Sequence, residues 1–161
     1  MNFVHANAAP EPRYGAVRVG DWLPQTRQVP TRLQLFRYSA VTWNSHRIHF
    51  DPDYAAQEGY PDVLVQSHLH GAFLVSLCTN WMGAEGRLMQ IEVSVRRYAV
   101  PGDVLICGAQ VTAVEPVDDQ QGLVHLDLTE TRESDGTVCA RATATIALAS
   151  DNRFRREGDQ P

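Results

Sequence analysis

Cysteine is scarce in this sequence, and no two cysteines have the spacing of a metal site or a disulfide framework. Cys78, Cys107 and Cys139 lie far apart in the chain of 161 residues. An odd count without a C-x-x-C pair argues against a disulfide-rich secreted scaffold and against a zinc site. Because each cysteine lies in an apolar run, we expect three small buried side chains in a reducing compartment, and no metal.

Positive charge and long apolar runs are scarce as well. The 14 basic and 19 acidic residues give a formal net charge of -5, which argues against a nucleic-acid partner. A few local arginines can still bind an anionic ligand. The longest apolar run, 69–82, is interrupted by polar residues and is too short to cross a membrane. Since the N-terminus also lacks the pattern of a signal peptide, we expect a cytoplasmic protein with no membrane partner.

Length and composition predict one globular domain with flexible ends. Hydrophobic residues make up 43% of the chain and charged residues 20%, which is ordinary for a folded protein of this size. Residues 1–13 are rich in alanine and proline, and residues 150–161 are polar and charged, so both segments are expected to be flexible. The folded domain is therefore expected over 14–149.

The second half of the sequence predicts an antiparallel sheet. Apolar residues alternate with polar ones, or β-branched residues dominate, in four segments separated by turn signals such as Pro101-Gly102 and Asp135-Gly136. These segments are 88–96, 104–114, 123–131 and 138–148. Four successive strands joined by short turns favour one antiparallel sheet.

The first half predicts short pieces and one long helix. Strand-like pieces within 17–32 are interrupted by prolines, and 33–41 is expected to be a short helix. Residues 67–82 carry apolar side chains nearly all round, with Ser67 as the expected N-cap and Gly83 as the stop. A helix of this kind must be buried on most sides.

A long buried helix followed by antiparallel strands leaves few architectures. The sheet must curl around the helix, which is the α+β arrangement known as the hotdog fold. A single sheet of this kind has an open edge, so we expect two chains to pair, as a dimer or as a larger assembly of dimers.

Polar groups are concentrated in residues 42–51, just before the expected long helix. The segment reads T-W-N-S-H-R-I-H-F-D and holds two histidines, an asparagine, an arginine and an aspartate. These groups could carry catalysis. They could equally be structural, because Asn44 and Asp51 can cap turns and a histidine beside aromatic residues is often only hydrogen-bonded. From the residues alone, both interpretations remain open.

This segment and those after it resemble a known family. T-W-N-S-H-R-I-H-F-D, then Tyr54-Ala55, Gly59-Tyr60-Pro61 and V-L-V-Q-S-H-L-H-G are similar to the MaoC-like acyl dehydratases over about 19–148. Within them, the chain resembles the branch of mesaconyl-CoA hydratases and type 2 hydroxyacyl-thioester dehydratases. The resemblance implies a carbon-oxygen lyase of fatty acid metabolism that needs no cofactor. It would add water reversibly to a 2-enoyl-CoA or an enoyl-carrier protein.

The resemblance also implies roles for particular residues. The catalytic histidine of the family falls on His49, and its catalytic aspartate falls on Asn44. The oxyanion donors, backbone N–H groups at the start of the long helix, fall on Gln66, Ser67 and His68. Two residues depart from the pattern: Asn44 replaces an aspartate and Ser67 a glycine.

The expected chemistry agrees with these residue types. A neutral imidazole can take a proton from water, and N–H groups at a helix N-terminus can stabilise the enolate of a thioester. An amide has no useful pKa, so Asn44 can orient a group but cannot act as a base, which leaves His49 as the only acid/base. Phe73, Leu74 and Trp81 could line an apolar acyl tunnel, or they could be plain core.

Several neighbouring side chains allow two interpretations. Arg47 could bind substrate through a CoA phosphate, or it could form a salt bridge with Asp51 or Asp53. His46 could carry a second proton, although a structural tie to the loop is the favoured hypothesis. Arg96 and Arg97 could contact the 3′-phosphate of CoA, although a solvated sheet edge is the commoner explanation.

Two other functions remain as alternatives. A hotdog thioesterase would need a carboxylate on or near the long helix, where only Glu58 and Asp62, just before it, are available. A non-catalytic or half-site subunit of a heteromeric hydratase would explain Asn44, but it would not explain a retained His49. The expected partners are therefore an acyl thioester and a second hotdog chain, identical or different.

Overall fold

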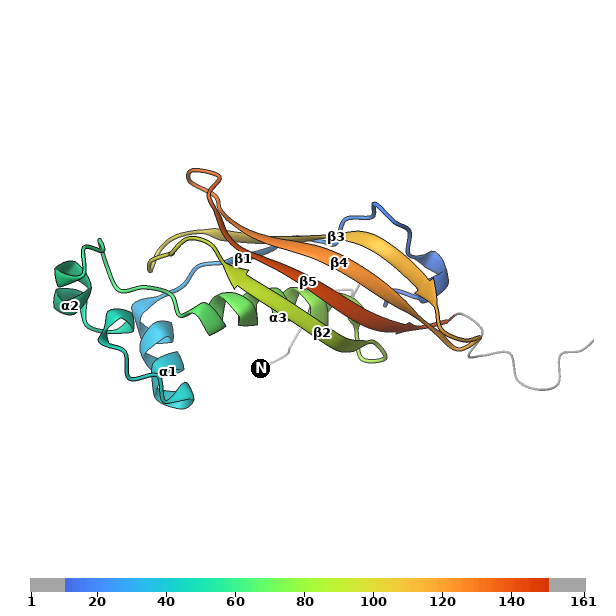
Figure 1. Ribbon diagram of the computed structural model, residues 1–161, viewed down its shortest axis with the longest axis horizontal. Helices are drawn as coiled ribbons and strands as arrows, with labels where there is room; N and C mark the ends of the chain where they lie inside the picture. Colours follow the sequence, from blue (N-terminus) through green and yellow to red (C-terminus); the bar gives the residue numbers. More distant parts are fainter. Residues whose placement is uncertain (1–10, 151–161) are drawn as a thin grey trace, which may run out of the picture.

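One long helix lies along a five-stranded antiparallel sheet in the computed structural model (Figure 1). The model describes residues 11–150, so nearly all of the two expected flexible ends lies outside the described residues. The elements in chain order are η1 Tyr14–Ala16, β1 Thr26–Gln28, α1 Arg32–Thr42, η2 Arg47–His49, α2 Pro52–Gln57, α3 Ser67–Met82, β2 Arg87–Val95, β3 Leu105–Pro116, β4 Gln121–Arg132 and β5 Val138–Ala149.

The sheet has the strand order β1-β3-β4-β5-β2. All four strands expected from the alternating pattern are present, and the hairpin between β4 and β5 is confirmed, with Gly136 at a φ of 70°. Strand β2 pairs with β5 and not with β3, a strand order that the sequence pattern did not specify. The chain between β2 and β3 instead crosses beside the start of α3, where the Val65 N–H donates to the Ala99 carbonyl at 2.9 Å.

Helix α3 is the helix expected at 67–82, with a different cap. Gln66 is the N-cap and adopts an extended backbone, so the expectation for Ser67 is wrong by one residue. The side of α3 that faces the sheet is buried, and each fully buried leucine there contributes roughly 1.5–3 kcal/mol to folding. The buried residues are Leu69, His70, Phe73, Leu74, Leu77 and Cys78. The opposite side is open in the single chain, and Ala72 and Thr79 on it are exposed.

The three cysteines are free and buried, as their apolar surroundings predicted. Burial raises the pKa of the Cys78 thiol to about 11. Burial, with the nearby Glu130 charge, raises the pKa of Cys107 to about 12. These thiols stay protonated at neutral pH, so they are packing groups and not nucleophiles.

Helices α1 and α2 extend beyond the sheet at the end where α3 begins (Figure 1). The short η2 turn lies between them and contacts both. This extension carries the whole polar segment that the sequence singled out, and it brings that segment to the N-terminus of the buried helix. Within residues 11–150, no helix combines the length and the apolarity needed to cross a membrane.

Candidate active site

His49 is held in one tautomer by the loop that precedes α3. Its Nδ1 lies 2.8 Å from the carbonyl oxygen of Leu64, and since a carbonyl can only accept, Nδ1 carries the proton. The other ring nitrogen, Nε2, is then an unprotonated acceptor. Burial lowers the pKa of His49 below its ordinary value of 6.5, the Leu64 hydrogen bond partly opposes this, and the His46 charge lowers it further. The half-buried imidazole is therefore neutral at neutral pH and can accept a proton.

Leu64 is bonded to this turn at two points. Its N–H donates to the Ile48 carbonyl at 2.9 Å, while its own carbonyl accepts from His49. His46 begins the same turn, and its Nδ1 accepts from the Ile48 N–H at 3.3 Å. This contact fits the structural tie favoured for His46. Its ring also lies 5.9 Å from that of His49, so the two imidazoles are neighbours.

Asn44 is positioned by the end of α1. Its N–H donates to the Ser39 carbonyl at 3.0 Å, and its side-chain Oδ1 accepts from the His46 N–H at 3.2 Å. The Nδ2 group donates to no other residue of the part of the chain that the structure describes. Asn44 therefore presents a free amide donor beside His46, and it caps the turn at the same time.

The start of α3 supplies unused backbone donors. Within residues 11–150 the N–H groups of Ser67 and His68 have no acceptor, whereas those of Leu69 and His70 bond back to Gln66. Ser67 is three residues after Leu64, the partner of His49, so at most about 10 Å of chain separates them. The structure thus brings the expected oxyanion donors and the expected base to one end of the molecule.

The Gln66 side chain has a contact that the sequence did not predict. It is completely buried, and its Nε2 donates to the Leu35 carbonyl at 2.8 Å and to the Ser39 hydroxyl at 2.9 Å. Ser39 is the residue whose carbonyl accepts from Asn44. Gln66 therefore joins the N-terminus of α3 to the helix that positions Asn44.

Arg47 forms an ion pair within its own segment. Its Nη2 lies 2.6 Å from Asp51 Oδ2, and its guanidinium lies 4.7 Å from the centre of the Tyr54 ring. This is the salt bridge that one of the two interpretations predicted. The Asp51 carboxylate also accepts from the Tyr54 N–H and so caps α2.

An apolar hollow of ≈ 270 Å³ opens beside Asn44. It is lined by Phe36, Ser39, Ala40, Trp43, Asn44, Ser45 and Phe50. Trp43 is 93% exposed and Phe36 is 59% exposed, so the hollow has large aromatic walls with nothing packed on them. Exposed apolar walls of this size mark a place where a ligand or a partner binds.

For Phe73, Leu74 and Trp81 the sequence left two interpretations open, a tunnel lining and plain core. Phe73 and Leu74 are buried in the core against the sheet, and Trp81 packs partly buried against the same core. The sequence pattern did not reveal Phe36, Trp43 and Phe50 as walls of this hollow, because single aromatic residues in a polar segment show no periodicity. Trp43, directly before Asn44, was the one visible signal. Within the described residues, no cluster of acidic, histidine or cysteine side chains is arranged to hold a metal.

Solved structures with the same fold confirm the hotdog architecture. R-hydratase PhaJ1 from Pseudomonas aeruginosa matches with a TM-score of 0.74 and 19% identity, over 86% of this chain and 85% of that chain. The ChsH1-ChsH2 complex from Mycobacterium tuberculosis matches with a TM-score of 0.72 and 19% identity, over 81% of this chain and 98% of that one. At these identities the likeness establishes the fold alone.

Sequence comparison leads to the family. Mesaconyl-C(4)-CoA hydratase from Chloroflexus aurantiacus is 48% identical over 50 residues, which cover 30% of this chain and 18% of that enzyme. The part of the chain that matches thus spans less than a fifth of the length of this curated relative. The family model described as hydroxyacyl-thioester dehydratase type 2 matches residues 4–100, more than half of the chain, including the whole candidate site. The chain belongs to the hydroxyacyl-thioester dehydratase type 2 family.

Proposed function

We propose that this protein is a hydratase/dehydratase that adds water reversibly to a 2-enoyl thioester. The observation that carries the proposal is the hydrogen bond from His49 Nδ1 to the Leu64 carbonyl. This hydrogen bond leaves Nε2 of His49 free as a base. The bonded Leu64 is only a few residues before the α3 N-terminus, where backbone N–H groups have no acceptor. A base and an oxyanion site are the two groups that this reaction needs.

The reaction can proceed with His49 as the only acid/base. Nε2 takes a proton from water, and the hydroxyl forms a bond to C3 of the enoyl group. The electron pair of the double bond moves toward the thioester oxygen, where the N–H groups of Ser67 and His68 stabilise the enolate. The proton held by His49 then passes to C2. Water is consumed, the imidazole is regenerated, and no cofactor takes part.

Asn44 and the adjoining hollow would orient the substrate. The free Nδ2 of Asn44 can donate to the attacking water or to the thioester carbonyl, although it cannot remove a proton. The hollow of ≈ 270 Å³ lined by Phe36 and Trp43 suits a short apolar acyl group. We do not assign a substrate role to Arg47, because Asp51 already engages it.

The open edge of the sheet supports pairing with a second hotdog chain. Strand β2 lies at one edge, and Met89, Val93 and Val95 on it are exposed. An exposed apolar edge strand normally pairs with another chain. We propose that the domain, over 14–149, forms a homodimer or a heterodimer across this edge. The free buried cysteines suit the reducing cytoplasm, where we place the enzyme.

The thioesterase alternative is weaker. Of the two carboxylates before α3, Asp62 is occupied, because its Oδ2 accepts from Arg32 at 2.9 Å and its Oδ1 from the Val63 N–H at 2.7 Å. Glu58 is exposed at the end of α2. Neither is a free, partly buried base of the kind that hydrolysis of a thioester requires.

Hydration of crotonyl-CoA by the purified chain, followed as loss of the enoyl absorbance, tests the proposal. His49→Ala should lower kcat by about 10²–10⁴. His125→Ala, on β4, is the matched control and should leave the rate unchanged. Full activity in His49→Ala would overturn the mechanism. Activity that appears only after a second hotdog chain is added would identify this chain as a half-site subunit.

A further inference from the structure

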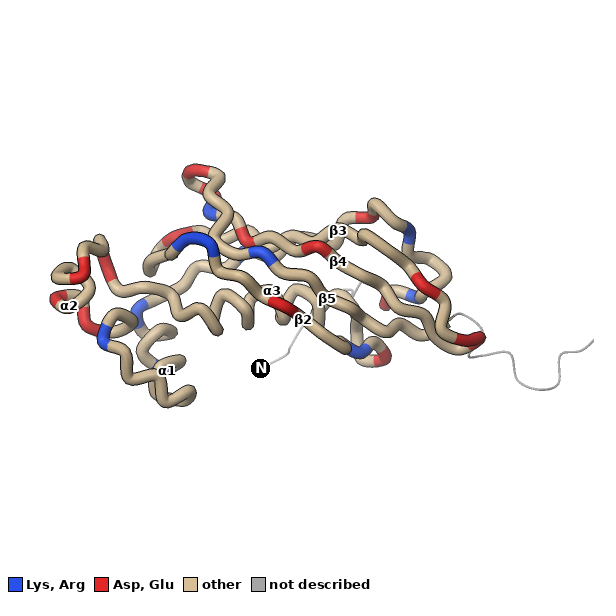
Figure 2. The backbone as a smooth tube through the Cα atoms, in the orientation of Figure 1, with Lys and Arg blue, Asp and Glu red and all other residues tan. Residues whose placement is uncertain are grey.

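Three exposed arginines surround an open hollow at one end of the sheet. Arg96 and Arg97 follow directly after β2, and Arg141 lies on the neighbouring β5, where it is next in register to Ser94. With Thr137 and Val138 they line a hollow of ≈ 490 Å³. In Figure 2, blue segments mark the basic residues where β2 ends and on the adjoining part of β5.

These arginines have no acidic partner in the part of the chain that the structure describes. None of the three guanidinium groups lies within 4 Å of a carboxylate of the described residues, whereas Arg13, Arg27, Arg32, Arg47 and Arg132 each form an ion pair. Arg18, Arg37 and Arg87 are also without an ion pair in this part of the chain, but they do not line this hollow. Glu92 and Asp127 line a second hollow together with Arg96 and Arg141, without forming an ion pair. Three unpaired cations converging on one hollow repel each other, so an anionic ligand would stabilise them.

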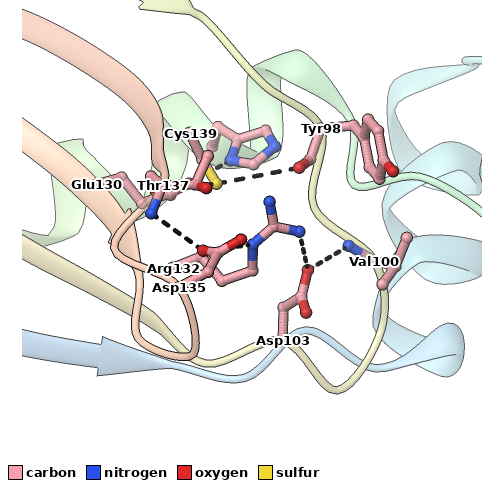
Figure 3. A network of polar contacts seen from close by, with 9 residues as sticks. Tyr98, Val100, Asp103, Glu130, Arg132, Asp135, Thr137 and Cys139 are labelled. Atoms are coloured by element: carbon pink, nitrogen blue, oxygen red, sulfur yellow. Dashed lines mark hydrogen bonds and ion pairs between the residues drawn. The ribbon is translucent and has the colours of Figure 1, made fainter.

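The segment that carries Arg96 and Arg97 is fixed in place. Both backbone N–H groups donate to the Cys139 carbonyl, at 2.7 and 3.1 Å. Further along, Asp103 accepts from the Val100 N–H at 3.0 Å and pairs with Arg132 at 3.4 Å (Figure 3). The arginines therefore start from an ordered backbone, which lowers the entropy lost when a ligand binds.

The same segment leads to the candidate active site. Ala99 accepts from the Val65 N–H, and Val65 is adjacent to Leu64, the partner of His49. Tyr98 also packs edge-on against Tyr60, with ring centres 5.3 Å apart. Arg97 lies two residues from Ala99, at most about 7 Å along the chain. The hollow is thus at the α3 N-terminal end of the molecule, yet separate from the reacting groups.

We propose that Arg96, Arg97 and Arg141 bind the phosphate groups at the nucleotide end of a coenzyme A thioester. The proposal rests on the proposed hydratase function and names the carrier of its acyl group. In CoA a long pantetheine arm separates the thioester from a diphosphate and a 3′-phosphate, so a phosphate site must lie apart from the base but at the same end. Planar guanidinium groups match phosphate oxygens in pairs, and the hollow has the size of a small-molecule site.

The surroundings favour CoA over an acyl-carrier protein. A carrier protein brings one phosphate and a broad acidic surface. Glu92 and Asp127 line a hollow together with two of the arginines, and the chain has a net charge of -5, so this surface would repel an acidic protein. A compact ligand that carries several phosphates can reach the arginines without covering the acidic residues.

Two substrates that differ only in the nucleotide provide the test. KM should be measured for crotonyl-CoA and for crotonyl-pantetheine with the full-length protein, wild type and Arg97→Gln/Arg141→Gln. Loss of charged hydrogen bonds should raise the KM for the CoA ester roughly tenfold or more, with the penalty absent for the pantetheine ester. Arg87→Gln, at the opposite end of β2, is the matched control. The affinity for adenosine 3′,5′-bisphosphate, measured by calorimetry, should be lower for the double variant than for the wild type and should be unchanged for Arg87→Gln.

The outcomes separate the two proposals. An unchanged KM for crotonyl-CoA, or an equal rise for both esters, overturns the phosphate site while the hydratase function stands. If the double variant loses activity on an enoyl-carrier protein but keeps it on crotonyl-CoA, the phosphate site is also overturned. The arginines would then be assigned to docking of the carrier protein. If the wild type hydrates neither ester, the proposed function fails, and bisphosphate binding still decides whether the arginine site exists.

Discussion

His49 donates from Nδ1 to the carbonyl oxygen of Leu64 across 2.8 Å, so the backbone entering α3 sets the tautomer of the imidazole. The same stretch of backbone continues into Gln66, which holds α1, and into the unused N–H groups of Ser67 and His68. One short loop therefore connects His49, the helix that positions Asn44 and the free N–H groups of Ser67 and His68, which we propose as base, orienting group and oxyanion donors. Rigid positioning of this kind is what lowers an activation barrier.

The first prediction concerns pH. Burial lowers the pKa of His49 below 6.5, and the base must be neutral to accept a proton. The midpoint of the acid limb of kcat/KM for hydration should therefore lie below pH 6.5. His46→Gln removes a like charge, so it should raise the His49 pKa and move the acid limb to higher pH. A midpoint above pH 6.5 in the wild type would contradict this assignment.

Trp43 is the subject of the second prediction. It ends α1 in the left-handed region, with a φ of 54°, and its side chain is 93% exposed. Trp43→Gly should raise the free energy of unfolding by about 1 kcal/mol, because glycine adopts this conformation without strain. It should also raise KM, because one wall of the acyl hollow is lost.

Trp43→Ala separates these two effects. Alanine keeps the unfavourable φ but removes the aromatic wall, so KM should rise without a gain in stability. Urea unfolding and initial rates measure the two quantities independently. Equal stability of the glycine and alanine variants would show that the backbone at this position is not strained.

The third prediction concerns Gln66 as a positioning residue. Gln66→Leu keeps the volume but removes donors to the Leu35 carbonyl and the Ser39 hydroxyl, and should lower the free energy of unfolding by about 1–3 kcal/mol. It should lower kcat more than it changes KM, because α1 and Asn44 shift relative to the α3 N-terminus. Gln57→Leu, exposed at the end of α2, is the control. A variant as active as the wild type would limit Gln66 to a structural role.

A buried pair between α3 and the sheet gives the fourth prediction. His70 Nδ1 lies 2.5 Å from Glu130 Oε1, and these side chains are 1% and 0% exposed. Removing one partner should be costly, so Glu130→Leu should lower the free energy of unfolding by about 3–5 kcal/mol. The double variant His70→Leu/Glu130→Leu should recover much of that loss, since an apolar pair needs no hydrogen bonds. If urea unfolding shows that the double variant loses as much stability as the two single variants together, the expected recovery is refuted.

Local patterns in the sequence were sufficient to predict most elements. Alternating residues predicted the strands, and apolar residues nearly all round predicted α3, because burial imposes a period on each element. The motif around His49 predicted the family and most of the residues gathered at the site. The sequence also predicted that Asn44 could not be a base, since that follows from the amide group itself.

Contacts between distant segments were decided only by the tertiary structure. The pairing of β2 with β5, the Gln66 bridge to α1, the aromatic hollow and the His70–Glu130 pair each join residues far apart in the chain. No local periodicity encodes such contacts. The sequence by itself determined which chemical groups this protein has. Only the tertiary structure decided that His49 forms a hydrogen bond with the Leu64 carbonyl. That contact sets the tautomer of His49, because the tautomer of an imidazole depends on its hydrogen-bond partners.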